Sequence, residues 1–113
     1  MDLFGWWRGA DSPTAPPRGD PSVPAVRRRC RFAGLVQDVG FRWEAKMLAG
    51  RLGLTGWARN ESDGTVTVEL EGPESTLEEF LRKMQAVPRF DITDVQTEEL
   101  PPRGDERTFE IRY

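Results

Sequence analysis

Histidine is absent from the 113-residue sequence, and cysteine occurs once, as Cys30. Without histidine, neither a Ser-His-Asp nor a Cys-His catalytic arrangement can form, and zinc sites that need histidine are excluded as well. A single cysteine can form no internal disulfide, which is typical of proteins from reducing compartments. Any catalysis by this chain therefore has to use arginine, lysine, asparagine, carboxylates and main-chain amides.

Long apolar runs are also missing, because nothing approaches the roughly 18 consecutive apolar residues that a membrane-spanning helix needs. The N-terminal residues lack a basic segment followed by a long apolar stretch, so they do not predict a signal peptide. The formal net charge of −3 does not favour binding of the whole surface to nucleic acid or to an anionic membrane. We therefore expect a cytoplasmic protein.

Two regions of different composition divide the chain near residue 26. Residues 1–26 contain five prolines interleaved with Gly, Ser, Asp and Ala, a composition that favours extended, mobile chain over a packed core. Phe4, Trp6 and Trp7 in this region are either an incidental apolar start or a short anchor for a partner, and the sequence leaves both readings open. We predict a disordered Pro-rich tail over residues 1–26 and one folded domain over residues 27–113.

The folded region shows a regular succession of strand and helix patterns. Alternating polar and apolar residues predict strands, and apolar residues at i, i+4 and i+7 predict helices. Ser75 with Glu78 indicates a capping box at the start of the second helix. The predicted elements are a strand over 27–33, a loop over 34–40, a helix from Phe41 to Leu52 ended by Gly53, strands over 54–60 and 65–70, a helix that ends before Pro88, and strands over 92–100 and 108–113.

This order predicts an α+β, ferredoxin-like βαββαβ sandwich. Its antiparallel sheet should carry both helices on one face, with a short extra C-terminal strand. In the first strand, Arg27, Arg29 and Arg31 should face away from the side that carries Cys30 and Phe32. The fold itself names no function, because the same scaffold hosts many functions.

The first segment with chemical potential is GLVQDVGFR, residues 34–42, between the first strand and the first helix. A loop that feeds a helix N-terminus directs several main-chain N–H groups and the positive end of the helix dipole at one spot. Arg42 in the first turn can add a planar, bidentate guanidinium group. The segment is therefore either a cradle for a phosphate-sized dianion or a connector with a solvated arginine.

The second segment is GLTGWARNESDG, residues 53–64, which covers the second strand and its hairpin turn. A strand–helix–strand crossover makes its two strands parallel, so both end at the same edge of the sheet. Asn60 should then lie beside the 34–40 loop, where its amide can both donate and accept hydrogen bonds to orient a water molecule. Asn60 is alternatively a simple turn residue, since Asn suits hairpin turns.

Together the two segments resemble the signature motifs of the acylphosphatase family, in the right order and separation. The resemblance runs from about Arg27 to Tyr113. It implies hydrolysis of acyl phosphates by a small enzyme that needs no metal and no cofactor. We also expect a monomer, and the acidic net charge disfavours a nucleic-acid partner. The resemblance assigns phosphate binding and catalysis to Arg42 and the positioning of water to Asn60. It places the phosphate cradle on the main-chain amides of Leu35, Val36, Gln37, Asp38 and Val39.

One residue departs from the family pattern: Asp38 stands where glycine is usual, and its carboxylate would repel a bound dianion if it faced the cradle. Two alternatives to an active enzyme also remain open. The domain could be a weakly active or non-catalytic relative that binds a protein partner. It could also bind RNA or another polyanion through Arg27, Arg29 and Arg31, although these arginines are equally consistent with a solvated or salt-bridged face.

Overall fold

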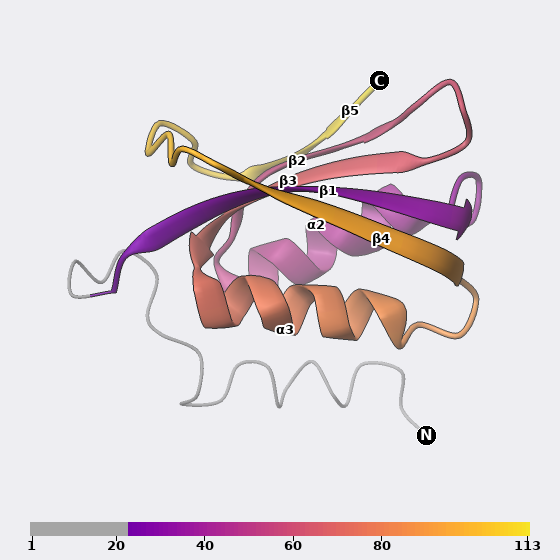
Figure 1. Ribbon diagram of the computed structural model, residues 1–113, viewed down its shortest axis with the longest axis horizontal. Helices are drawn as coiled ribbons and strands as arrows, with labels where there is room; N and C mark the ends of the chain where they lie inside the picture. The colour runs from indigo at the N-terminus through magenta and orange to yellow at the C-terminus, as the bar shows by residue number, and fades with distance from the viewer. Residues whose placement is uncertain (1–22) are drawn as a thin grey trace.

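The computed structural model describes residues 23–113, so nearly all of the tail predicted for residues 1–26 lies outside the described residues. The predicted order of strands and helices is confirmed (Figure 1). The elements are β1 (Ala25–Leu35), α2 (Phe41–Leu52), β2 (Thr55–Asn60), β3 (Val66–Pro73), α3 (Glu74–Gln85), β4 (Asp91–Leu100) and β5 (Phe109–Arg112).

The sheet has five strands in the order β4-β1-β3-β2-β5. Because β3 is antiparallel to both β1 and β2, those two strands run parallel to each other and end at the same edge. Phe32 near the end of β1 and Asn60 at the end of β2 both pair with Val66. The extra strand β5 joins β2 in parallel, which makes the sheet mixed. The sheet topology thus brings the two motif segments to one edge.

Both helices cover one face of the sheet, and the core lies between the two layers (Figure 1). Phe32 of β1, Phe41 at the start of α2 and Phe90 just before β4 are all buried. Their rings form two tilted contacts, Phe32–Phe41 and Phe41–Phe90, each with centroids 4.9 Å apart. Such aromatic contacts have a preferred geometry, so this packing fixes the first residue of α2 against the sheet.

The helix ends agree with the sequence at α2 and differ from it at α3. The predicted bounds of α2 are confirmed, and Gly53 ends the helix in the left-handed conformation at φ 72°, which favours glycine. The predicted capping box at Ser75 and Glu78 is wrong. Pro73 is the N-cap of α3, no side chain caps the helix, and Ser75 lies within the first turn. The fixed φ of proline already directs the chain into the helix at this point.

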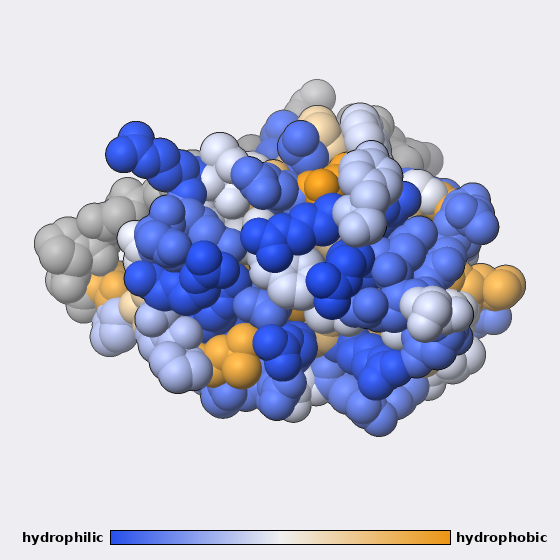
Figure 2. All heavy atoms as spheres, turned by 90° about the horizontal axis from the view of Figure 1, so that it is seen from above, coloured by the Kyte–Doolittle hydropathy of each residue, from blue (hydrophilic) through white to orange (hydrophobic). Residues whose placement is uncertain are grey.

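The other face of the sheet is covered by no helix of residues 23–113, and in Figure 2 it is predominantly hydrophilic. The predicted alternation of β1 is confirmed, since Cys30 and Phe32 are in the core while Arg27, Arg29 and Arg31 bond to partners on the open face. Arg29 pairs with Glu69 and Glu98, and Arg31 pairs with Asp63. These contacts agree with the salt-bridged interpretation of the arginines.

Arg27 lies at the centre of a buried ionic cluster that consists of Arg27, Glu69, Glu71 and Glu106. The Arg27 side chain is 1% exposed, and its guanidinium group donates to Glu69 at 2.9 Å, to Glu71 at 3.0 Å and to Glu106 at 2.7 Å. Glu71 also accepts two main-chain N–H bonds of 2.8 Å from Arg103 and Gly104. The cluster therefore ties the segment between β4 and β5 onto the sheet.

Candidate active site

The two motif segments meet at a cavity of about 240 Å³ at the edge where β1 and β2 end. We call it the site cavity. Its walls come from the loop after β1, the first turn of α2, the end of β2 and the C-terminal strand. The residues that line it are Val36, Asp38, Gly40, Phe41, Arg42, Trp43, Asn60, Ile111 and Tyr113.

The loop before α2 is a tight turn with two residues in the left-handed region, Asp38 at φ 62° and Gly40 at φ 80°. Within residues 23–113, no main-chain amide from Val36 to Gly40 donates a hydrogen bond to another main-chain group. These amides and the N-terminal end of α2 are therefore available to an anion, because a helix N-terminus carries partial positive charge. The turn suits a phosphate-sized dianion.

The close approach of the loop to β4 depends on Gly34. At φ 117°, Gly34 sits at an irregularity in the β1–β4 pairing, and a Cβ at this position would lie 2.0 Å from the carbonyl oxygen of Asp91. Any larger residue would have to displace main-chain atoms. Gly34 therefore sets the direction in which the chain leaves β1 and enters the cradle loop.

Two side chains hold this loop from outside the site cavity. The Gln37 amide donates to the carbonyl oxygens of Glu61 at 2.7 Å and Thr65 at 2.9 Å, which links the loop to the β2–β3 hairpin. Arg89, from the α3–β4 connection, donates to the Val39 carbonyl at 2.9 Å and to the buried carboxylate of Glu44 at 2.6 Å. The loop is thus fixed on both sides by hydrogen bonds.

Arg42 comes from the first turn of α2 and has few partners in the described part of the chain. Its guanidinium group donates one hydrogen bond, of 3.0 Å, to the Arg112 carbonyl. It also lies over the Tyr113 ring, 4.8 Å from the centroid, a distance at which a cation is attracted to the aromatic face. Because a guanidinium group has five N–H donors, Arg42 retains donors for a ligand in the site cavity.

Asn60 is the last residue of β2 and reaches the same cavity from the sheet. Among the described residues, no hydrogen bond is formed by its side-chain amide. The neighbouring turn obtains its bonds elsewhere, since the Glu61 N–H donates to the Thr65 carbonyl at 2.8 Å and Asp63 caps Thr65. The turn therefore does not depend on the Asn60 amide, which is open to a ligand or a water molecule.

The predicted site residues divide into two groups. Val36, Asp38, Arg42 and Asn60 line the site cavity, whereas Leu35, Gln37 and Val39 do not. Leu35 is exposed and Val39 packs against the core, so these three could serve a ligand only through their main-chain amides. Sequence reasoning missed Trp43, Ile111 and Tyr113 in the wall and Arg89 behind the loop. For Ile111 and Tyr113 the sequence did hold a signal, because the two residues alternate with polar ones and should lie on one side of the last predicted strand.

Cys30 lies in the core and does not line the site cavity. Burial raises the pKa of the Cys30 thiol to about 12, so this residue stays protonated in the core. Within the described range, no group of three or more His, Cys, Asp or Glu residues could hold a metal ion. No helix among residues 23–113 has the length and apolar character to span a bilayer.

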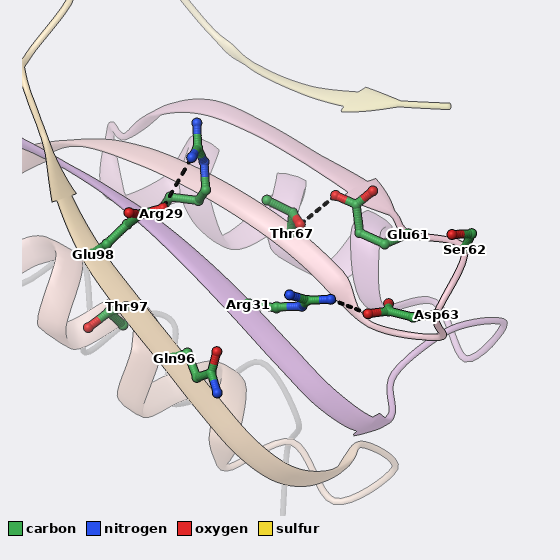
Figure 3. A pocket seen from close by; sticks show the side chains of 9 residues that line it. All are labelled: Arg29, Arg31, Glu61, Ser62, Asp63, Thr67, Gln96, Thr97 and Glu98. Atoms are coloured by element: carbon green, nitrogen blue, oxygen red, sulfur yellow. Dashed lines mark hydrogen bonds and ion pairs between the residues drawn. The ribbon is translucent and has the colours of Figure 1, made fainter.

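A larger hollow of about 630 Å³ lies on the open face of the sheet (Figure 3). Its charged groups already have partners: Arg31 binds Asp63, Arg29 binds Glu98 at 3.1 Å, and Glu61 binds Arg59 at 3.2 Å. Carboxylates outnumber guanidinium groups in its lining, which disfavours an anion there. The residues that line it are Arg29, Arg31, Glu61, Ser62, Asp63, Thr67, Gln96, Thr97 and Glu98.

Comparison with known proteins gives consistent matches. The family profile described as Acylphosphatase matches residues 28–111. An acylphosphatase from Bacillus licheniformis is 43% identical over 81 residues, which covers 71% of this chain and 90% of that protein. An acylphosphatase from Legionella pneumophila is 46% identical over 83 residues, which covers 74% of this chain and 91% of that protein.

Solved structures share the fold as well. The crystal structure of acylphosphatase from Bacillus subtilis superposes with a TM-score of 0.73 at 34% identity, covering 78% of this chain and 99% of that one. A crystal structure of full-length HypF, in a phosphate- and nucleotide-bound form, gives a TM-score of 0.75 at 30% identity over 85% of this chain and 13% of the larger protein. On these matches, together with the fold and the two motifs, the chain belongs to the acylphosphatase family.

Proposed function

We propose that this chain hydrolyses the carboxyl–phosphate bond of acyl phosphates in the site cavity, with Arg42 binding the phosphate and Asn60 placing the attacking water. Membership of the acylphosphatase family supports the reaction. The observation that supports the residue roles is the placement of Arg42 and Asn60, from two separate motifs, on the wall of one small cavity.

The phosphate group would lie against the free amides of the loop between Val36 and Gly40, where the N-terminus of α2 adds positive potential. The remaining donors of Arg42 would bind its oxygens. Phosphoryl transfer through a loose transition state needs mainly positioning and charge stabilisation. This arrangement of donors supplies both without an acid, a base or a nucleophile from the protein.

The water oxygen held by the Asn60 amide would form a bond to phosphorus while the bond between phosphorus and the bridging oxygen breaks. The electron pair of the broken bond stays with the acyl group, which leaves as a carboxylate. A proton of the water moves to a phosphate oxygen, so that the products are a carboxylate and dihydrogen phosphate. Because a carboxylate is a stable anion, it needs no protonation as it leaves, which agrees with a chain that has no histidine.

The finer expectations from the sequence belong to the same proposal. We propose that the loop from Leu35 to Val39 is the phosphate-binding loop and that the enzyme works as a cytoplasmic monomer without nucleic acid, metal or cofactor. The buried, unpaired Cys30 is consistent with a reducing compartment. Size-exclusion chromatography with light scattering tests the monomer, and hydrolysis in the presence of a strong chelator tests the independence from metal.

The function is tested by the hydrolysis of benzoyl phosphate, followed by ultraviolet absorbance. We expect hydrolysis by the native chain and a loss of 100-fold or more in both Arg42→Ala and Asn60→Ala, since loss of one electrostatic group from a transition-state site typically costs about 10²–10³ in kcat. Arg82→Ala is a matched control, because Arg82 is an exposed arginine on α3. A native chain without activity, or an Arg42→Ala variant with full activity, would contradict the proposal.

A further inference from the structure

Trp43 is a large apolar side chain that the core does not use. It follows Arg42 in the first turn of α2, lines the site cavity, and is 54% exposed. Of the cavity residues carried by α2, Phe41 is buried and Arg42 is charged. Trp43 is therefore the residue through which the helix offers an apolar surface to a bound molecule.

The sheet contributes apolar groups to the same cavity. Ile111 of β5 and Tyr113, the residue after that strand, line it, and Tyr113 is 96% exposed. The guanidinium group of Arg42 lies over the Tyr113 ring. The site cavity thus combines the donors proposed for phosphate binding with an apolar wall made by two aromatic side chains from different elements.

The geometry of in-line displacement at phosphorus determines which part of the substrate contacts the apolar wall of the site cavity. The attacking and leaving oxygens lie on opposite sides of the phosphorus atom. If Asn60 holds the attacking water at the sheet edge, the acyl group points away from Asn60. Trp43 comes from the helix and not from the sheet that carries Asn60, and it is the exposed apolar residue that α2 contributes to the cavity wall.

We propose that the site prefers acyl phosphates with an apolar, preferably aromatic, acyl group, and that Trp43 is the residue that recognises this group. This inference rests on the proposed function. An indole ring gives a planar apolar surface against which an aryl group can stack. A small acyl group such as acetyl contacts much less of that surface, so Trp43 discriminates between the two classes of substrate.

The test compares kcat/KM for benzoyl phosphate and acetyl phosphate in the native chain, Trp43→Ala and Trp43→Phe. We expect Trp43→Ala to lower kcat/KM for benzoyl phosphate about tenfold and to leave that for acetyl phosphate within about twofold, since an aromatic contact contributes of this order. Trp43→Phe should restore most of the preference. The inhibition constant for inorganic phosphate should not change in either variant.

Met47 supplies the control, because it is another exposed apolar residue of α2 but lies outside the site cavity. Met47→Ala should keep the native ratio of the two kcat/KM values. An equal loss on both substrates in Trp43→Ala, or no change on either, would overturn the inference while hydrolysis by the native chain leaves the proposed function intact. A native chain that hydrolyses neither substrate would instead overturn the proposed function.

Discussion

Arg27 and Arg42 lie near opposite ends of β1, Arg27 within the strand and Arg42 in the helix that follows it, and they have opposite surroundings. Arg27, at the start of β1, is 1% exposed and bonds to three carboxylates. Arg42, next to the edge where β1 ends, bonds within the described residues to one main-chain carbonyl and lies over one aromatic ring. The guanidinium group of Arg27 thus has three carboxylate partners, whereas that of Arg42 has no carboxylate partner in residues 23–113.

This difference separates a structural arginine from one that is available to a ligand. Burial alone would lower the pKa of Arg27, but hydrogen bonds to its three carboxylates raise it above the ordinary value. Its charge is therefore locked into the ionic cluster. A cation without a carboxylate partner beside free main-chain amides can instead complete its hydrogen bonds with an anion. The environment of an arginine, more than its presence, indicates its role.

The strongest test of this contrast is the pair Arg27→Met and Arg42→Met. We expect Arg27→Met to lower the free energy of unfolding by about 3–5 kcal/mol, because it leaves the buried carboxylate of Glu71 without its cation and that of Glu69 with only the partner Arg29. Arg42→Met should change it by less than about 1 kcal/mol, since the side chain makes few contacts. Urea denaturation of both variants, monitored by circular dichroism, measures the two values.

Activity should respond in the reverse order. Folded Arg27→Met, assayed well below its unfolding midpoint, should retain most of its benzoyl phosphate hydrolysis, whereas Arg42→Met should lose nearly all of it. Equal destabilisation by the two substitutions would show that the ionic cluster contributes no more than a surface arginine. The distinction between a structural Arg27 and a ligand-binding Arg42 would then be wrong.

A second test concerns Arg89, which acts on the cradle loop without lining the site cavity. Arg89→Ala removes the bonds to the Val39 carbonyl and to Glu44, so the loop should lose its fixed position. We expect KM for benzoyl phosphate and the inhibition constant for inorganic phosphate to rise together by about tenfold, with a smaller change in kcat. Steady-state kinetics with phosphate as a competitive inhibitor measures all three.

The matched variant is Arg89→Lys, which can still pair with Glu44 but cannot bond to both acceptors through one planar group. We expect an intermediate effect on KM. A fall in stability in Arg89→Ala with unchanged phosphate inhibition would show that Arg89 supports only the fold. Arg89 would then not be a positioning residue for the phosphate.

The sequence predicted those features that depend on local patterns. The bounds of α2 follow from the spacing of Phe41, Ala45 and Leu48 and from Gly53, and the meeting of Arg42 with Asn60 follows from the crossover between parallel strands. The ionic cluster was not predicted, because the partners of Arg27 lie between 42 and 79 residues away in the chain. Only the register of β1 against β3 places Glu71 beside Arg27.

The same reason explains the unpredicted parts of the site. Arg89 reaches the loop from the connection between α3 and β4, and no local pattern marks that contact. Trp43 was not predicted because its position in the helical pattern does not distinguish a residue that lines a cavity from one that only faces solvent. The absence of a capping box at Ser75 has a different cause, since the motif was present in the sequence but the N-cap is Pro73, two residues before Ser75.

The smallest expected effect concerns Asp38, the departure from the family pattern within the cradle. Asp38 lines the site cavity, is exposed, and has a φ of 62°. Asp tolerates this left-handed conformation better than most residues, which explains how the turn forms without glycine. Asp38 nevertheless lines a site proposed to bind a dianion, and a carboxylate that faced this dianion would cost on the order of 1 kcal/mol in water-like surroundings.

Asp38→Gly should therefore lower KM for benzoyl phosphate by up to about fivefold, and Asp38→Asn separates the two possible causes. Asn keeps the size and the tolerance for positive φ but removes the charge, so it should lower KM as much as Gly does if repulsion is responsible. If only Gly lowers KM, the freedom of the main chain is responsible instead. An unchanged KM in both variants would mean that the carboxylate points into solvent, and that the cradle depends on its amides and Arg42 alone.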